Sequence, residues 1–418
     1  MQPRAEHTGA RGRAATPGLR VSVDARPLDI EHLRSQGIGR YAHGLVGPLA
    51  QVAAERGGQL VLLRERRQGP AAFAGAQPAR APARPHGADI ASAQVAIRTP
   101  RRPPLPAGLA DWPEQVLLPL DLRRARVAVH HALSIYRAAV LAGVPTVMTM
   151  HDVAPLMWPQ DHLRGGRTHR LLYAAARRAR LLLAVSEVAR RDVIAHLGVP
   201  PERVLCIPEA ADERFRPTDP RPARDRLGLS GRYLLYIGGL ATRDPRKNVE
   251  GLIDAFAAWW HSQQRSERLV LTGELGPAGE ELRARAQRSG APIAFTGFVT
   301  DEELPGLLCG AACLVTATRY EGFGLPALEA ISCATPVVAF DAGAVPEVAG
   351  PGCLAVPDGD GVALMRAAGG VCDEPQLRER LAEDGRRHAR RYSWRHTAEL
   401  TWDAYERAAG PQGGGSSP

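Results

Sequence analysis

The chain has 418 residues, 44% hydrophobic and 23% charged, which is the composition of a globular protein large enough for two domains. No apolar run approaches the roughly 20 residues that span a bilayer, and the polar start is unlike a secretory signal, so we expect a cytoplasmic protein. The formal net charge of +9 favours an anionic partner, but the aromatic content of only 5% argues against nucleic acid.

Short apolar runs alternate with helical patterns along most of the chain, which is typical of βαβ units on parallel sheets. Residues 1–18 are expected to form a disordered lead-in. The following strands are expected at 19–24, 59–64, 127–130, 144–151, 181–186 and 204–208. Helices are expected at 40–54, 167–180 and 187–197. The Pro-, Ala- and Arg-rich stretch 68–119 is expected to form irregular loops with one or two weak strands.

The proline-rich segment 216–222 is the best candidate for a linker. Beyond it, strands are expected at 233–237, 269–272, 293–296, 312–316, 337–340 and 353–356. Helices are expected at 249–260, 280–288, 301–308, 325–332, 375–390 and 394–408. The pattern predicts an α/β protein with two doubly wound, Rossmann-like domains, 19–215 and 216–390, that face a central cleft. We expect segment 391–408 to pack back on the first domain and 409–418 to form a disordered tail.

Lys247 is the only lysine in the chain, because every other basic side chain among its 53 lysines and arginines is an arginine. Lysine offers a compact ammonium on a flexible stem, whereas arginine is a planar fork. Lys247 follows an expected strand and the Gly238-Gly239 turn, and it precedes an expected helix. Free backbone amides and the helix dipole at such a position favour an anion. The sequence therefore predicts an anion site, with a codon accident on an exposed turn as the alternative.

A second motif, from Glu321 to Glu329, follows the strand expected at 312–316 and reads Glu-Gly-Phe-Gly-Leu-Pro-Ala-Leu-Glu. Pro326 suits a first helical turn, so the preceding glycine turn can present free amides to the same cleft. The two glutamates would lie roughly 12 Å apart along a helix and could flank an extended ligand. Carboxylates beside an anion site suit hydroxyl groups, which sugars supply. Two solvated glutamates at a helix start are the alternative.

Together these features fit a nucleoside diphosphate sugar. Lys247 would neutralise the diphosphate, the amides of 322–324 would hold its oxygens, Glu329 would bind the ribose and Glu321 the transferred sugar. At this point the sequence resembles glycosyltransferase family 4, the retaining nucleotide-sugar glycosyltransferases with the GT-B fold. The segment from Glu321 to Glu329 matches that family's paired-glutamate motif, and Pro245-Arg-Lys-Asn248 matches its diphosphate-binding element. The likeness extends from Val21 to about Ala408.

The resemblance implies transfer of a hexose with retention of configuration, with no cofactor beyond the nucleotide sugar and no metal. Asp358-Gly-Asp360 is read as a turn rather than as a metal-binding pair. Gly37-Ile-Gly39 would approach the donor phosphate, or simply start a helix. His151 would hold the donor sugar, or be a satisfied cleft residue. The expected catalytic residues are Glu321, His151 and Lys247. The expected donor-binding residues are Gly37, Gly39, Arg243, Arg246, Lys247, Phe298, Val299, Glu321, Gly322, Phe323, Gly324, Leu325 and Glu329.

One departure from the family pattern concerns the arginine that many members carry just after the Gly-Gly turn. This chain has Leu240 there, so either Arg243 or Arg246 must partner Lys247. The motifs resemble those of mannosyltransferase-like members, which favours GDP-mannose over UDP-sugars. The acceptor could be a saccharide, a lipid-linked saccharide or a secondary metabolite, and clustered arginines could contact the inner face of an anionic membrane.

Two other functions are left open by the sequence. Lys247 could instead form a Schiff base with pyridoxal phosphate in a phosphorylase-like enzyme of related architecture. The chain could also be a catalytically degenerate relative that serves as a partner or activator, since a fold alone does not establish an activity.

Overall fold

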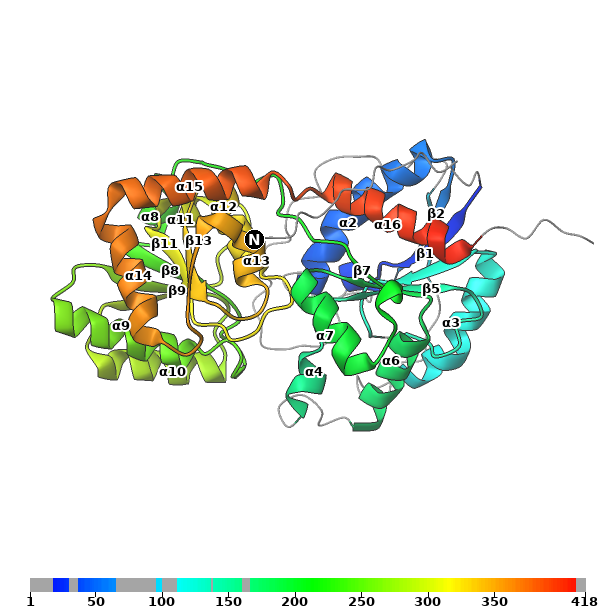
Figure 1. Ribbon diagram of the computed structural model, residues 1–418, viewed down its shortest axis with the longest axis horizontal. Helices are drawn as coiled ribbons and strands as arrows, with labels where there is room; N and C mark the ends of the chain where they lie inside the picture. The colour runs from blue at the N-terminus through cyan, green and yellow to red at the C-terminus, as the bar shows by residue number, and fades with distance from the viewer. Residues whose placement is uncertain are drawn as a thin grey trace, which may run out of the picture.

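The computed structural model describes residues 18–29, 37–64, 95–99, 111–136, 138–159 and 166–410. They form two α/β domains that lie side by side along the long axis of the molecule, each a parallel sheet flanked by helices (Figure 1). The predicted fold class of two doubly wound domains is confirmed. The lead-in expected at residues 1–18 and the tail expected at 409–418 lie outside the described residues except for Gly18, Ala409 and Gly410, and Ala409 is the last residue of α16 rather than part of a tail.

The N-terminal domain contains a seven-stranded parallel sheet within the described residues, in the order β3-β2-β1-β4-β5-β6-β7. Its strands are β1 (Arg20–Asp24), β2 (Gln59–Leu63), β3 (Val95–Arg98), β4 (Val129–Ala132), β5 (Thr146–Met150), β6 (Leu181–Ala184) and β7 (Val204–Cys206). Its helices are η1 (Arg26–Leu28), α2 (Gly37–Glu55), α3 (Asp111–Ala125), α4 (Ala154–Met157), α6 (Gly166–Arg178), α7 (Glu187–Leu197) and η3 (Pro201–Arg203). The central strands are buried because helices cover both faces, as in other all-parallel sheets.

The C-terminal domain repeats this plan with six parallel strands among the residues described, in the order β10-β9-β8-β11-β12-β13. The strands are β8 (Tyr233–Ile237), β9 (Arg268–Thr272), β10 (Ile293–Gly297), β11 (Cys313–Thr316), β12 (Val337–Phe340) and β13 (Cys353–Val356). The helices are α8 (Arg221–Arg226), α9 (Val249–Gln263), α10 (Pro277–Ser289), α11 (Leu304–Gly310), α12 (Leu325–Ser332), α13 (Val345–Ala349), η4 (Gly350–Gly352), α14 (Gly361–Asp373) and α15 (Pro375–Ala389), and α16 (Trp394–Ala409) ends the described chain.

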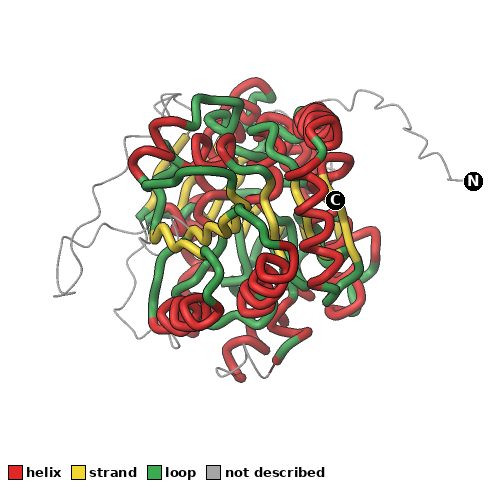
Figure 2. Tube along the Cα trace, turned by 90° about the vertical axis from the view of Figure 1, so that its left-hand side faces the viewer, coloured by secondary structure: helices red, strands yellow, loops and turns green. Residues whose placement is uncertain are grey.

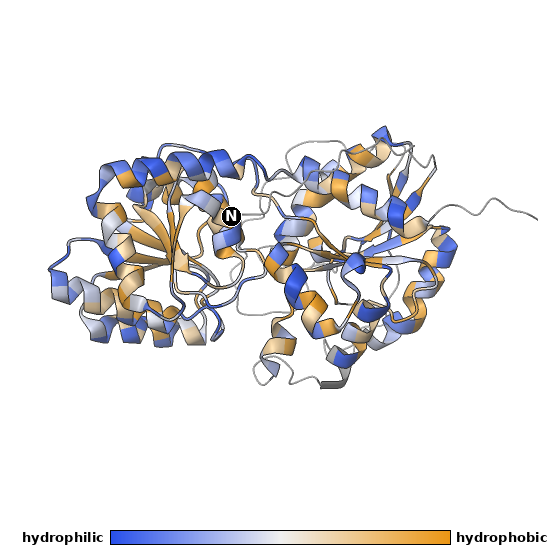
Figure 3. Cartoon of the chain, viewed as in Figure 1, coloured by the Kyte–Doolittle hydropathy of each residue, from blue (hydrophilic) through white to orange (hydrophobic). Residues whose placement is uncertain are grey.

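The apolar residues gather on the strands and on the inner faces of the helices in both domains (Figure 3). In the end-on view toward the C-terminal domain, helices surround its sheet (Figure 2). None of the described helices combines the length and apolarity that a membrane crossing needs.

The strand order places one crevice in the C-terminal domain. Strand β8 lies between β9 and β11, so the chain winds away from β8 in opposite directions. Such a reversal opens a crevice at the carboxyl ends of the two adjacent strands, where ligands bind in this class of fold. Here the loops after β8 and β11 are residues 238–248 and 317–324. These loops contain Lys247 and Glu321.

Three local predictions are corrected by the structure. Helix α3 (Asp111–Ala125) begins within the stretch 68–119 that was expected to be irregular. Prolines obscured this helix, although its buried Leu118 and Leu122 pack with Val61 on β2. Helix α14 was not predicted, and α8 begins inside the expected linker 216–222. Glycines obscured α14 in the sequence. One of these glycines, Gly369, packs closely against a tryptophan ring.

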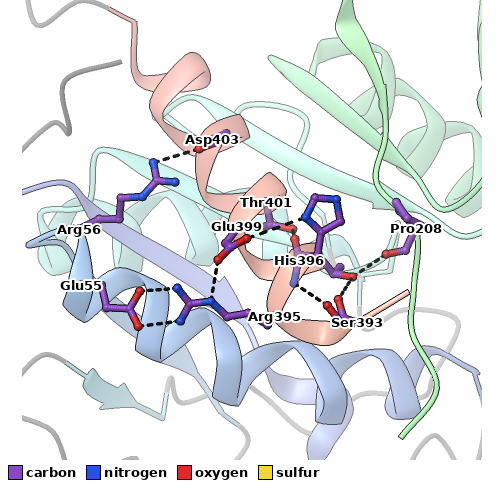
Figure 4. Close-up of polar contacts among 10 residues, drawn as sticks. Glu55, Arg56, Pro208, Ser393, Arg395, His396, Glu399, Thr401 and Asp403 are labelled. Atoms are coloured by element: carbon purple, nitrogen blue, oxygen red, sulfur yellow. Dashed lines mark hydrogen bonds and ion pairs between the residues drawn. The ribbon is translucent and has the colours of Figure 1, made fainter. Parts of the chain in front are cut away.

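The last helix, α16, leaves the C-terminal domain after α15 and packs against α2 of the N-terminal domain (Figure 1). Its first turn is capped by Ser393, whose hydroxyl accepts a hydrogen bond from the backbone N–H of His396 at 3.1 Å (Figure 4). Arg395 pairs with Glu55 at the end of α2, and Arg56 pairs with Asp403 at 3.0 Å (Figure 4). Because these ion pairs are exposed, they contribute to the orientation of the helix but add little to the free energy of folding.

Close packing explains two glycines at this helix contact. A Cβ atom at Gly44 would come within 2.1 Å of the ring of Trp394, and one at Gly58 within 2.3 Å of the ring of Trp402. Only glycine allows both indole rings to approach the backbone this closely. The Thr397 hydroxyl also donates a hydrogen bond to the carbonyl oxygen of Pro208, at 2.8 Å.

Candidate active site

The two loops at the crevice are tied together through their backbones. Arg319 N–H donates to the carbonyl oxygen of Arg246 at 2.8 Å, and the Asn248 side chain donates to the carbonyl oxygen of Ala317 at 3.3 Å. Asn248 has a positive φ of 47°, a conformation that asparagine tolerates better than most residues, and it occupies the N-cap position of α9 without a side-chain hydrogen bond to the helix. This geometry turns the chain sharply, so that Lys247 lies at the helix start beside the second loop.

Lys247 and Glu321 are in direct contact, because the lysine ammonium hydrogen-bonds to Oε1 of the glutamate. Both side chains are only partly buried, so the pair is open to exchange with a ligand. Each side chain neutralises the charge of the other. The structure thus brings together two of the three residues that the sequence identified as catalytic.

The two candidate arginines differ in position. Arg246 is 16% exposed, pairs with Asp244 at 2.8 Å and lies 3.5 Å from Asp152 of the N-terminal domain. Arg243 is 72% exposed and lies 3.5 Å from Glu250 on the surface. Arg246 therefore faces the domain interface next to Lys247, and Arg243 does not.

Glu329 lies in α12 and is 1% exposed. Its Oε1 is 2.5 Å from the Nη2 atom of Arg40, which comes from α2 of the other domain. Its Oε2 is buried and has no hydrogen-bond partner among the described residues. Burial raises the pKa of Glu329 to about 7, and Arg40 opposes this rise. A buried carboxylate oxygen without a partner is unfavourable, so this oxygen calls for a hydrogen-bond donor from outside the described chain, such as water or a ligand.

The glycine turn between the two glutamates lies against the N-terminal domain. A Cβ atom at Gly322 would come within 1.7 Å of the carbonyl oxygen of His151, so only glycine fits. The Ser186 hydroxyl donates a hydrogen bond to the carbonyl oxygen of Gly322 at 2.6 Å. Gly324 has a φ of +90° at the start of α12, which also favours glycine. Phe323 and Leu325 are buried beside the turn.

His151 is held by both of its ring nitrogens. Nδ1 lies 3.0 Å from a carboxylate oxygen of Glu209, and Nε2 lies 3.0 Å from the carbonyl oxygen of Leu133. A carbonyl oxygen can only accept, so Nε2 carries a proton. Burial lowers the pKa of His151, but the bonds to Glu209 and Leu133 outweigh burial and raise it. No ring nitrogen is left free for a sugar in this arrangement.

The remaining predicted residues make no contact with Lys247, Glu321 or Glu329 among the hydrogen bonds and ion pairs of the described chain. Phe298 is 58% exposed, whereas Val299 is buried. Gly37 and Gly39 form the first turn of α2, and the residues just before them, 30–36, lie outside the described residues. Asp360 caps α14 by accepting from the Ala363 N–H at 2.8 Å, which agrees with a turn. No group of three or more His, Cys, Asp or Glu side chains with metal-binding geometry occurs in the described ranges.

Sequence reasoning missed Arg40, Glu209 and Asp152. Each contacts a predicted residue from a distant part of the chain, and no motif joins the two partners. Arg40 directly follows the Gly37-Ile-Gly39 motif, which was the one available signal.

Comparison with known proteins agrees with this architecture. Two family models match the chain, one for Glycosyltransferase Family 4 over residues 36–215 and one for Glycosyl transferases group 1 over residues 231–373. The chain superposes on sucrose-phosphate synthase from Thermosynechococcus elongatus with a TM-score of 0.69, over 93% of this chain and 98% of that one, at 19% identity. Its two facing domains define it as a glycosyltransferase of the GT-B class.

Sequence relatives make the assignment more specific. The chain is 30% identical over 296 residues to O-antigen chain mannosyltransferase B of Escherichia coli, covering 68% of this chain and 76% of the relative. It is 32% identical over 284 residues to the MMP alpha-(1->4)-mannosyltransferase of Mycolicibacterium hassiacum, covering 64% and 66%. The chain belongs to glycosyltransferase family 4.

Proposed function

We propose that this glycosyltransferase moves a hexose, mannose in the first instance, from a nucleoside diphosphate sugar to a hydroxyl group of an acceptor. Transfer would retain the anomeric configuration and need no metal ion. The observation that carries the proposal is the buried Oε2 of Glu329, which has no hydrogen-bond partner among the described residues, in the same domain as the contact between Lys247 and Glu321. A nucleoside diphosphate sugar offers hydroxyl groups for the carboxylates and an anion for the ammonium.

In this mechanism the diphosphate takes Lys247 away from Glu321. Arg246 adds a second positive charge, because it lies at the interface and Arg243 does not. As the bond to the anomeric carbon breaks, negative charge grows on the diphosphate, and fixed cations stabilise it more in the transition state than in the ground state. Glu321, once released, accepts hydrogen bonds from the transferred sugar.

Glu329 would accept hydrogen bonds from the ribose through its unpartnered oxygen. We infer that His151 contacts the sugar only if one of its two hydrogen bonds is exchanged for a sugar hydroxyl. Domain closure would exclude water and limit hydrolysis of the donor. A Schiff base is less favoured, since it needs a neutral lysine and Lys247 pairs with a carboxylate.

Mannose is proposed because both curated relatives named above are mannosyltransferases. GDP-mannose is the first donor to test, and UDP-sugars are the second. The acceptor would bind to the N-terminal domain and would be a saccharide, a lipid-linked saccharide or a small molecule. Contact with an anionic membrane stays a prediction from the arginine clusters of the sequence.

A donor panel tests the proposal directly. Thermal unfolding would be followed with GDP, UDP and their hexose conjugates, with and without a chelator. A ligand at 100 times its Kd should stabilise the fold by about 2.7 kcal/mol. Product analysis by NMR with the best donor would then give the anomeric configuration. If no nucleotide sugar raises the Tm and none is consumed, the proposed function is wrong.

A further inference from the structure

We propose that Arg40 is a positioning residue for the donor nucleoside. From the N-terminal domain its guanidinium binds the carboxyl group of Glu329 of the C-terminal domain and orients it toward the ribose, so that the nucleoside site is complete only when the two domains are closed. This inference rests on the proposed function, because it requires a nucleoside in the cleft.

Arg40 reaches from the N-terminal domain to acidic residues of the C-terminal domain. Arg40 lies in the first turn of α2, yet its Nη2 atom is 2.5 Å from Oε1 of Glu329 and 3.9 Å from Asp301, both in the C-terminal domain. The guanidinium also lies over the ring of Phe215, 5.5 Å from its centre. A planar cation that stacks on a ring and binds a carboxylate has little freedom to turn. Arg40 therefore fixes the direction of the Glu329 carboxylate.

Charged side chains from both domains surround Glu329. The groups that face it are Arg40 from α2, Asp301 from the loop after β10 and Asp212 from the segment after β7. Arg214 pairs with Asp212 at 2.9 Å and lies 4.0 Å from Asp301. These two aspartates therefore have a cation of their own. Arg40 is left as the cation that favours an ionised Glu329, whose side chain is otherwise fully buried.

The hydroxyl groups of a ribose need hydrogen-bond acceptors. An ionised carboxylate accepts at both oxygens, whereas a protonated one gives up part of that capacity and becomes a donor. Arg40 takes one position on Oε1 and leaves Oε2 buried and without a partner within the described structure. A ribose diol would supply the missing donors. Because Arg40 belongs to the opposite domain, closure and nucleoside binding must strengthen each other, as linkage requires.

The test uses the 418-residue chain and measures the Kd of GDP and UDP by calorimetry between pH 5.5 and 8.5. In the wild type, affinity should fall as the pH drops below about 7, the value at which Glu329 takes up a proton. Arg40→Gln should weaken binding about tenfold or more at pH 7 and move this fall to higher pH. Arg40→Lys should restore part of the affinity. Glu329→Gln should bind weakly at every pH, with no such fall.

Arg56→Gln is the matched control, because Arg56 directly follows α2. Among the described residues it forms ion pairs only with Asp403 and Glu406 of α16. It should bind nucleotides like the wild type. The double variant Arg40→Gln/Glu329→Gln should bind no more weakly than Glu329→Gln alone, and an additive loss would overturn the inference. So would an Arg40→Gln protein with the wild-type Kd and pH profile. If the wild type itself binds neither nucleotide, the proposed function fails instead.

Discussion

Lys247 and Glu321 hydrogen-bond to each other, so a donor that binds both residues must replace the partner of each. Lys247→Ala and Glu321→Gln should each lower kcat by about 10²–10³, since losing one preorganised charge contact in a transition state costs about 3–4 kcal/mol. Steady-state kinetics with the best donor measures the loss.

Arg243→Ala provides the control for these two variants, because Arg243 lies on the surface beside Glu250. It should keep turnover near that of the wild type. All three proteins should unfold within a few degrees of one another, since the residues are partly exposed. Full activity in Lys247→Ala or Glu321→Gln would contradict the assignment of the site.

Glu329 should make stability depend on pH in an unusual direction. Its folded-state pKa of about 7 lies above the ordinary value of 4.5, so its contribution to stability is greatest in acid and is lost as the pH rises toward 7. Glu329→Gln removes this cost. Relative to the wild type, the variant should therefore gain about 2–3 kcal/mol of stability between pH 5 and pH 8. Denaturant unfolding at the two pH values measures the gain, and an equal effect at both would rule out a raised pKa.

The site could be predicted only in part from the sequence. Lys247, Glu321 and Glu329 were predicted as site residues because a glycine turn, a helix start and an eight-residue spacing are local patterns. Arg40 and Glu209 were not found, since their partners lie in remote segments and the contacts exist only after folding.

At the scale of elements, α16 is joined to α2 by a chain of buried hydrogen bonds. The Tyr405 hydroxyl lies 2.6 Å from Nδ1 of His131, whose Nε2 lies 2.9 Å from the Thr149 hydroxyl. That hydroxyl is 3.1 Å from the hydroxyl of Tyr41, and the Tyr41 ring meets His151 edge-on at 4.9 Å. The chain thus runs from α16 through β4 and β5 to α2.

Removing one end of this chain should be costly. Tyr405→Phe leaves a buried nitrogen of His131 without its partner, which should destabilise the fold by about 1–3 kcal/mol. Tyr392→Phe is the matched control, because its hydroxyl is 3.5 Å from His388 and only partly buried. Urea unfolding of both variants checks the difference. Equal stabilities would show that the chain of hydrogen bonds contributes little.

Elements with an uninterrupted apolar run were predicted well, such as β8 and β12, whose bounds agree with the structure. Helices α3 and α14 were missed for a physical reason. Proline and glycine disfavour a helix locally, but burial of a few residues, such as Leu118 in α3 and Leu364 in α14, outweighs that preference.

At the scale of the whole molecule, several contacts hold the two domains together. Glu347 accepts hydrogen bonds from the backbone N–H groups of Glu187 and Val188, at 2.8 and 3.0 Å, and so caps the first turn of α7 in the other domain. The Tyr320 hydroxyl donates to Asp192 at 3.0 Å. A carboxylate at a helix start gains from both the free amides and the helix dipole.

Glu347→Ala should favour an open arrangement. Loss of this cap should cost the closed state about 1–2 kcal/mol, by analogy with caps within one helix. The radius of gyration from small-angle scattering should increase, and the donor KM should rise more than kcat falls. Glu383→Ala, an exposed change on α15, is the control. An unchanged scattering curve would show that Glu347 does not stabilise closure.

The chain passes between the two domains twice, once between β7 and α8 and again between α15 and α16. Two separate tethers leave one easy relative movement, a rotation about the line that joins them, and resist twisting and sliding. The cleft would then open and close by rotation of one domain relative to the other about this line. Cleavage of the backbone near residue 391 would remove one of the two connections. The two domains would then lose their alignment even with every side chain of the site intact.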